Sequence, residues 1–269
     1  MKGVKLTGLV VLIRGAGEMA TGVAHRLWQA RFWVCMTEIP NPLAIRREVS
    51  FCEALYDGEK TVEGVTAKRV IDVEALRPTW DKGKIPVLVD PEAAVRGFLR
   101  PSVIVDAILA KRNLGTAMAD APLVIGLGPG FVAGKDAHLV IETNRGHHLG
   151  RLIWQGSAEP DTGVPGMIAG YGAERVLRAP NSGRFEPLKQ IGDPVEANEA
   201  VAVVRGSPME SRISGVLRGI LREGVEVQKG MKSGDVDPRG NRDACFTISD
   251  KARAIAGSVL EGILFTFNR

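Results

Sequence analysis

Short apolar runs alternate with glycine-rich and polar segments through the N-terminal part of the chain. Residues 9–13 are the apolar run LVVLI, and RGAGEMA follows at 14–20. A helical pattern then covers 21–30, and a second apolar run at 32–37 ends at Glu38. This order predicts a strand, a glycine turn, a helix and a second strand, as in the first crossover of a parallel sheet.

More apolar runs follow at 86–89, 103–105, 123–125 and 138–141. They are typical of buried parallel strands, whose carboxyl ends meet at one edge of a sheet. Asp90 and Asp106 follow two of these runs, so each either faces a shared crevice or caps the next segment. Gly128 belongs to a second glycine turn, for which Pro129 favours a backbone nest or a rigid loop. The pattern at 43–54 predicts a helix.

The C-terminal part has a different pattern. Short strand-like pieces separated by turns are expected at 174–178, 183–187, 200–204, 211–216 and 226–227. The segment resembles the biotinyl/lipoyl-like barrel-sandwich hybrid, although the tip at 205–210 has no lysine for a covalent cofactor. Ser249 is expected to cap a helix that ends near Phe267 and docks on the core.

The expected fold is therefore α/β in three parts. Residues 1–172 form a Rossmann-like nucleotide-binding domain with a parallel sheet. Residues 173–247 form a small all-β domain like a barrel-sandwich hybrid, and 248–269 form the C-terminal helix.

Composition narrows the choice of partners. The 269 residues include 35 Lys and Arg against 31 Asp and Glu, without a visible basic patch, so nucleic acid is not expected as a partner. The apolar run at 9–13 is too short for a membrane span or a secretory signal, which predicts a cytoplasmic protein without a membrane partner. Cys35, Cys52 and Cys245 lack metal-ligand spacing, so no metal is expected.

The glycine turn is the main candidate binding site. Gly15 permits the tight turn, Gly17 permits close approach of a ligand, and the helix start offers amides to a diphosphate. Glu38 follows Gly17 by 21 residues, near the spacing expected for the acid that binds ribose hydroxyls. The predicted ligand is an NAD-like or molybdopterin dinucleotide. The alternative is a glycine turn that only packs a helix. The residues predicted to bind the cofactor are Gly15, Ala16, Gly17, Glu18, Met19, Ala20, Glu38, Asp90, Asp106, Gly128 and Arg145.

Two further places have candidate chemistry. The segment 142–151, ETNRGHHLGR, contains Arg145, His147, His148 and Arg151, which either bind an anion and supply an acid or base, or form a polar hairpin. Arg145 and His147 are the preferred candidates. Cys245 lies just before the helix start, where a thiol becomes more acidic and can carry sulfur or selenium, although a buried structural thiol is favoured. His147 and Cys245 are the catalytic candidates, and whether the protein is an enzyme stays open.

Four stretches together resemble a known family. They are RGAGEMATG at 14–22, ETNRGHHLGR at 142–151, GDVDPR at 234–239 and CFTISDKAR at 245–253. The chain resembles the accessory proteins of selenium-dependent molybdenum hydroxylases, of the YqeB type, and its N-terminal part is distantly similar to XdhC-type accessory factors.

That resemblance implies a role in maturing a molybdenum hydroxylase, by handling its pterin dinucleotide or its terminal sulfur or selenium ligand. The client hydroxylase and a small nucleotide are then the expected partners, and a homo-oligomer is compatible with this role. Two alternatives remain: an NAD-dependent oxidoreductase that uses the same glycine turn, and a ligand-free scaffold for the hydroxylase.

Overall fold

The computed structural model describes residue 6 and residues 8–268, and the chain divides into two compact units. Unit 1 comprises residues 1–42, 50–161 and 248–269. Unit 2 comprises residues 43–49 and 162–247. The predicted boundary between residues 172 and 173 therefore falls inside unit 2, and the C-terminal helix belongs to unit 1. The division between the units falls between residues 161 and 162.

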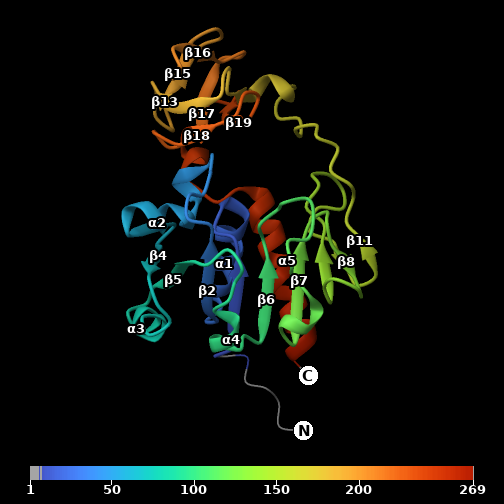
Figure 1. Ribbon diagram of the computed structural model, residues 1–269. Coiled ribbons are helices and arrows are strands. Elements are labelled where there is room, and N and C mark those ends of the chain that lie inside the picture. The colour runs from blue at the N-terminus through green and yellow to red at the C-terminus, as the bar shows by residue number, and fades with distance from the viewer. Residues whose placement is uncertain (1–5, 7, 269) are drawn as a thin grey trace. The chain divides into compact units, whose positions relative to one another are not determined.

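Unit 1 is built on a mixed sheet that, among the described residues, has nine strands in the order β10-β9-β7-β6-β1-β2-β5-β4-β3 (Figure 1). Neighbours from β9 to β4 are parallel, whereas β10 and β3 pair antiparallel at the edges. The strands are β1 (Val10–Arg14), β2 (Trp33–Glu38), β3 (Glu59–Val62), β4 (Val65–Val70), β5 (Ile85–Val89), β6 (Val103–Asp106), β7 (Leu123–Leu127), β9 (Leu139–Ile141) and β10 (Leu152–Ile153). A separate pair joins β8 (Val132–Ala133) to β11 (Gly156–Ser157).

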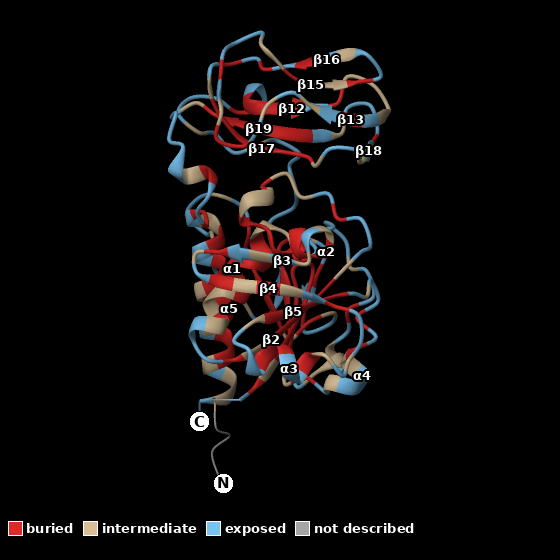
Figure 2. Cartoon of the chain, turned by 90° about the vertical axis from the view of Figure 1, so that its left-hand side faces the viewer, coloured by how far each residue is buried: buried red, intermediate tan, exposed pale blue. Residues whose placement is uncertain are grey.

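The strand order reverses beside β1. The chain passes from β1 to β2 and β5 on one side, and then returns to the other side for β6, β7 and β9. Such a reversal opens a crevice at the carboxyl ends of the central strands. These strands are buried on both faces, which explains their continuous apolar runs (Figure 2).

Helices α1 (Glu18–Gln29) and α5 (Asp250–Phe267) pack against each other in unit 1. A Cβ added to Gly22 of α1 would lie only 2.9 Å from the Cβ of Ala252, so glycine permits this close packing. The side chain of Ser249 accepts a hydrogen bond from the Ala252 amide, which confirms the predicted helix cap. The short helices are α2 (Ala54–Asp57), α3 (Leu76–Asp81) and α4 (Arg96–Leu99).

The predicted helix over 43–54 is wrong. This segment forms two 3₁₀ turns, Arg47–Val49 and Phe51–Glu53. Within unit 2, the Ile45 carbonyl accepts a 3.0 Å hydrogen bond from the Ile220 amide, and Arg47 Nε donates a 2.8 Å bond to the Ile220 carbonyl. The segment is therefore tied to a strand far away in sequence, and its residues divide between the two units.

Unit 2 is all-β around its own core. Its sheets have the orders β12-β19-β17-β14 and β16-β15-β13-β18 among the described residues. Phe185, Val201 and Leu217 are fully buried in a shared apolar cluster. The strands are β12 (Val176–Arg178), β13 (Gly183–Pro187), β14 (Pro194–Val195), β15 (Ala200–Val204), β16 (Ser207–Glu210), β17 (Gly215–Ile220), β18 (Glu226–Val227) and β19 (Lys232–Asp237).

The predicted strands at 183–187, 200–204 and 226–227 are confirmed. The strand predicted over 211–216 is wrong for residues 211–214, which connect β16 to β17, and only residues 215–216 belong to β17. No helix among residues 8–268 is long and apolar enough to cross a membrane.

Candidate functional site

The glycine turn after β1 requires glycine at its first position. Gly15 has φ of +96°, and a Cβ there would lie 3.0 Å from the carbonyl oxygen of Ala107. Gly17 is the N-cap of α1 and provides no side-chain cap, and a Cβ added to it would meet nothing within 4 Å. The space on the Cβ side of Gly17 is thus open, and the helix dipole favours an anion at the start of α1.

Glu38, at the end of β2, folds back onto this turn. Its Oε2 accepts a 2.8 Å hydrogen bond from the Ala16 amide, and its Oε1 accepts a 2.8 Å bond from the Ile39 amide. Burial raises the pKa of the Glu38 carboxyl above its ordinary value, although both amide hydrogen bonds act to lower it. The side chain therefore joins β2 to the glycine turn and retains lone pairs for another donor.

A pocket of about 340 Å³ opens beside Glu38, within the size range of small-molecule sites. Its lining comes from the carboxyl ends of β1 and β2 and from the segments that follow β5 and β6. Arg14, Gly15, Thr37, Glu38, Ile39, Pro91, Glu92, Ile108 and Leu114 line it. It therefore lies at the crevice where the strand order reverses, and it combines apolar walls with two carboxylates.

Asp106 makes a buried ion pair within the protein. Its Oδ2 lies 3.3 Å from Arg14 Nη1 and accepts a 2.6 Å hydrogen bond from Thr116 Oγ1. Arg14 and Asp106 are partners in the parallel pairing of β1 with β6. Asp106 was expected to bind a cofactor or cap a helix. It instead holds Arg14, which forms part of the pocket wall, and no helix follows it at 107–112.

Asp90 acts as a cap. Its two carboxylate oxygens accept hydrogen bonds from the amides of Ala94 and Val95, at 2.9 and 2.8 Å. It does not line the pocket beside Glu38, whereas the adjacent Pro91 and Glu92 do. These hydrogen bonds fit the interpretation of Asp90 as a cap of the next segment, and not the interpretation of Asp90 as a residue facing the crevice.

Gly128 has a packing role. Its φ is +77°, and a Cβ there would collide with the side chain of Thr143. Its amide donates a 2.9 Å hydrogen bond to the Ile141 carbonyl of β9. The second glycine turn thus lies tight against the adjacent strand, and Gly128 does not line the pocket beside Glu38.

The segment 142–151 contributes three residues to a second pocket of unit 1, also about 340 Å³, and the rest of its lining lies between residues 152 and 159. His148 and Arg151 line it with Glu142 and Glu159, whereas His147 and Arg145 do not. Arg145 makes a bidentate ion pair with Asp250, at 2.8 and 3.0 Å. Neither of the preferred candidates, Arg145 and His147, lines this pocket, and their preference over His148 stays a prediction.

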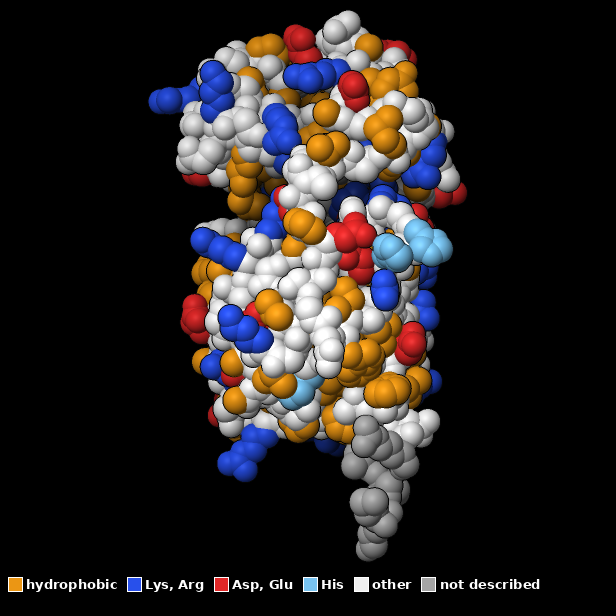
Figure 3. All heavy atoms as spheres, turned by 90° about the vertical axis from the view of Figure 1, so that its right-hand side faces the viewer, with side chains coloured by type: hydrophobic (Ala, Val, Ile, Leu, Met, Phe, Trp, Pro, Cys, Tyr) orange, Lys and Arg blue, Asp and Glu red, His pale blue; other side chains and the backbone are white. Residues whose placement is uncertain are grey.

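Both histidines of this segment are exposed, and their rings meet edge to face with centroids 5.1 Å apart. Exposed imidazoles are visible on the face that Figure 3 shows. The two predicted binding regions of unit 1 thus lie at separate pockets with no shared lining residue. A catalytic role for His147 stays a prediction.

Cys245 is fully buried in the core of unit 2. Its Sγ lies 3.9 Å from the Leu217 carbonyl oxygen, and burial raises the pKa of the thiol above its ordinary value. It belongs to the 3₁₀ turn Asp243–Cys245, before the cap of α5. These features match the structural thiol favoured from the sequence, because a reactive cysteine needs a lowered pKa and exposure.

Besides Arg14 and Ile39, which are direct neighbours of the predicted Gly15 and Glu38, five pocket residues had no signal in the sequence strong enough to single them out: Thr37, Glu92, Ile108, Leu114 and Pro91. Thr37 lies inside an apolar strand pattern, and the others lie in loops after β5 and β6. Their positions just after buried strands are the one available signal, because such positions share one edge of a parallel sheet.

Comparison with known proteins identifies one strong sequence relative. Over 261 residues the chain is 48% identical to the protein YqeB of Escherichia coli (strain K12), which is described as uncharacterized. The alignment covers 97% of this chain and 48% of that protein. No family model matches.

Solved structures give weaker matches. An aspartoacylase family protein from Mesorhizobium loti is 12% identical, with 85% of each chain covered and a TM-score of 0.28. A succinylglutamate desuccinylase/aspartoacylase from Rhodobacter sphaeroides is 15% identical, with 86% of this chain and 85% of that chain covered and a TM-score of 0.28. Scores of this size do not establish a common fold. The chain is thus a relative of Escherichia coli YqeB, and it spans about half of that protein's length.

Proposed function

We propose that unit 1 binds a dinucleotide at the pocket beside Glu38, with a ribose on the Glu38 carboxylate and the diphosphate at the start of α1. The observation that carries this proposal is the position of Glu38 between the glycine turn and the pocket, 2.8 Å from the Ala16 amide. The strand order supports it, because β9-β7-β6-β1-β2-β5 has the 6-5-4-1-2-3 arrangement of Rossmann-like dinucleotide-binding sheets.

The residues present fit such a ligand. The Gly15 amide donates to Thr37 and the Ala16 amide to Glu38, so the diphosphate would lie at the helix start from Gly17 onward. Gly17 leaves open space there, and α1 is long enough to have an effective dipole. The apolar walls formed by Ile39 and Ile108 suit the flat face of a nucleobase.

The pocket charge predicts which dinucleotide binds. Glu38 and Glu92 both line the pocket, and the guanidinium of Arg14 is engaged by Asp106. A 2′-phosphate would meet carboxylates there without a balancing cation, so an NAD-type ribose is favoured over an NADP-type one.

The experiment is a titration of the full chain with NAD, NADP, CDP and molybdopterin dinucleotides, followed by calorimetry and thermal unfolding. A bound dinucleotide at about 100 times its Kd stabilises the protein by about 2.7 kcal/mol. Glu38→Ala is expected to weaken binding by about 10- to 100-fold, the range for a hydrogen bond to a charged group. Glu74→Ala, which removes an exposed acid outside the pocket, is the matched control. Equal binding of NADP and NAD, or no effect of Glu38→Ala, would overturn the proposal.

We further propose that this binding serves the maturation of a selenium-dependent molybdenum hydroxylase, as the sequence resemblance implies. A strain lacking the chain is expected to make the hydroxylase with reduced cofactor content, and Glu38→Ala is expected not to restore it. Full restoration by Glu38→Ala would favour a ligand-free scaffold instead. Turnover of NADH by the isolated chain would favour an oxidoreductase.

A further inference from the structure

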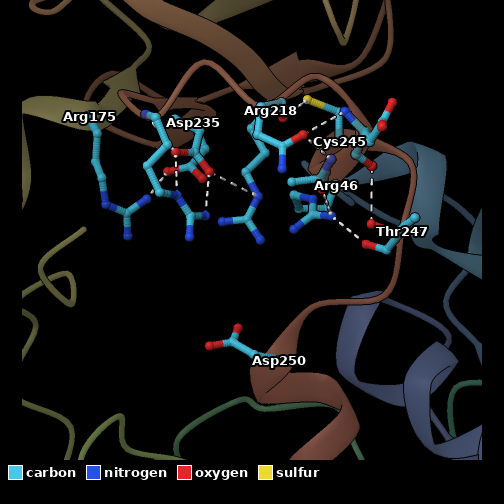
Figure 4. Close-up of polar contacts among 12 residues, drawn as sticks. Arg46, Arg175, Arg218, Asp235, Cys245, Thr247 and Asp250 are labelled. Atoms are coloured by element: carbon cyan, nitrogen blue, oxygen red, sulfur yellow. Dashed lines mark hydrogen bonds and ion pairs between the residues drawn. The ribbon is translucent and has the colours of Figure 1, made fainter. Parts of the chain in front are cut away.

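Unit 2 contains a group of arginines that the sequence patterns did not single out together. The side chains of Arg46, Arg175 and Arg218 point to the same side, away from the strands of unit 2 (Figure 4). The arginine cluster consists of Arg46, Arg175, Arg218 and Arg239, together with Asp235 and Asp237.

Strand geometry explains how these side chains come together. Asp235 and Asp237 are two residues apart on β19 and therefore project from the same face. Opposite them, Leu217 pairs with Val236 and Gly219 pairs with Asp235, so Arg218 is the extra residue of a β-bulge in β17. A bulge redirects a side chain out of the normal alternation. Here it brings Arg218 alongside the two carboxylates.

The carboxylates of the cluster are already engaged by other arginines. Asp235 pairs with Arg175, and Asp237 accepts hydrogen bonds of 2.9 and 2.6 Å from Arg239. Burial would raise the pKa of Asp237, but the bonds and charge of Arg239, together with the charge of Arg218, hold that pKa below its ordinary value. Asp237 is thus a carboxylate that stays ionised next to two cations.

Arg218 has the weakest partner in the cluster. Its Nε lies 3.9 Å from Asp237 Oδ2, which is too far for a hydrogen bond, and has no hydrogen-bond partner among the described residues. The residue is only 7% exposed, so water solvates its charge poorly. A buried guanidinium nitrogen without a hydrogen-bond acceptor is costly unless another group, such as a bound anion, supplies one.

We infer that the arginine cluster of unit 2 binds the phosphate group of a small phosphorylated molecule, with Arg218 as a direct contact. Arg218 offers a planar fork of donors, the geometry that matches phosphate oxygens in pairs. The cluster contains four guanidinium groups and two carboxylates, so its formal charge is +2, which a phosphate group of about −1.5 to −2 near pH 7 would neutralise. The site lies within unit 2 and does not depend on the dinucleotide proposed for unit 1.

The test measures binding of inorganic phosphate to the full chain by calorimetry at low salt, with malonate as a carboxylate probe. Phosphate is expected to bind at one saturable site with a Kd of about 1 mM or tighter. Arg218→Gln is expected to weaken binding by about 10- to 100-fold. The control Arg184→Gln removes an exposed arginine from β13 and is expected to leave the Kd within about twofold.

Two further variants test the role of the Arg218 guanidinium and the independence of this site from the pocket beside Glu38. Arg218→Lys retains the charge without the fork and is expected to weaken phosphate binding by about 3- to 10-fold, which tests the site even if Arg218→Gln does not fold. Glu38→Ala is expected to bind phosphate normally, so failure of the dinucleotide proposal is measured separately. No saturable phosphate binding, tighter binding of malonate, or equal losses in Arg184→Gln and Arg218→Gln would overturn the inference.

Discussion

Removal of the Asp106 carboxylate tests how the central strands are joined at the pocket. The Arg14 and Asp106 side chains are 6% and 2% exposed, respectively. Asp106→Ala removes the ion pair, the 2.6 Å bond from Thr116 and the 3.2 Å bond from the Ile108 amide. Breaking a buried ion pair on one side typically costs roughly 3–5 kcal/mol, because the remaining charge is uncompensated.

The structure favours the lower end of that range. Arg14 Nη2 keeps its hydrogen bonds to the carbonyl oxygens of Pro91 and Leu114, at 3.3 and 3.1 Å. We therefore expect a loss of about 3 kcal/mol from the free energy of unfolding of unit 1. For a unit of this size the midpoint of thermal unfolding should fall by about 6–12 °C. Asp106→Asn should lose less, because its amide oxygen still accepts from Thr116.

Tryptophan fluorescence makes the measurement specific to unit 1. Trp28, Trp33, Trp80 and Trp154 account for the four tryptophans of the chain, and all lie in unit 1. The control is Asp81→Ala, which removes an exposed 3.0 Å ion pair to Arg77 and should cost less than about 0.5 kcal/mol. A loss below about 1 kcal/mol for Asp106→Ala would show that the pair does not stabilise the sheet as argued.

Two further predictions concern thiol reactivity and pH. Burial raises the pKa of the Cys35, Cys52 and Cys245 thiols. A thiol reagent at pH 8 should therefore react slowly with the folded chain, and quickly with all three thiols after denaturation. Rapid labelling of Cys245 in the folded chain would contradict this prediction. Burial would raise the pKa of Glu63, but its bonds to Arg253 and the Ile248 amide outweigh burial and lower it. Because the pKa of Glu63 is lower in the folded chain than its ordinary value of 4.5, the carboxylate contributes its full stabilisation of the fold above pH 4.5. This stabilisation is lost progressively as the pH falls through the folded-state pKa. Amide protection factors at the start of α5, which are corrected for the intrinsic exchange rate at each pH, should therefore fall below about pH 4.5 in the parent chain, and an unchanged pH profile in Glu63→Gln would count against this anchor.

Local patterns were sufficient for several elements. The first strand, the glycine turn and the first helix follow from contiguous residues, and Glu38 follows from a short fixed spacing. Helix α5 was predicted from a cap at Ser249 and an apolar stripe. Strands β13 and β15 were predicted from short strand-like pieces between turns. In each case the signal lies within one element, because propensity and periodicity act over a few residues.

Long-range packing decided the rest. The 43–49 segment looked helical, yet its backbone is bonded to Ile220. Asp106 meets Arg14 across 92 residues, and this pairing depends on β6 lying next to β1. The β-bulge at Arg218 is a register shift between β17 and β19, so it depends on the pairing of the two strands and has no signal in either strand alone. Sequence determined which residues form turns, strands and caps, whereas tertiary structure decided which of their charged groups meet, since that depends on contacts between distant elements.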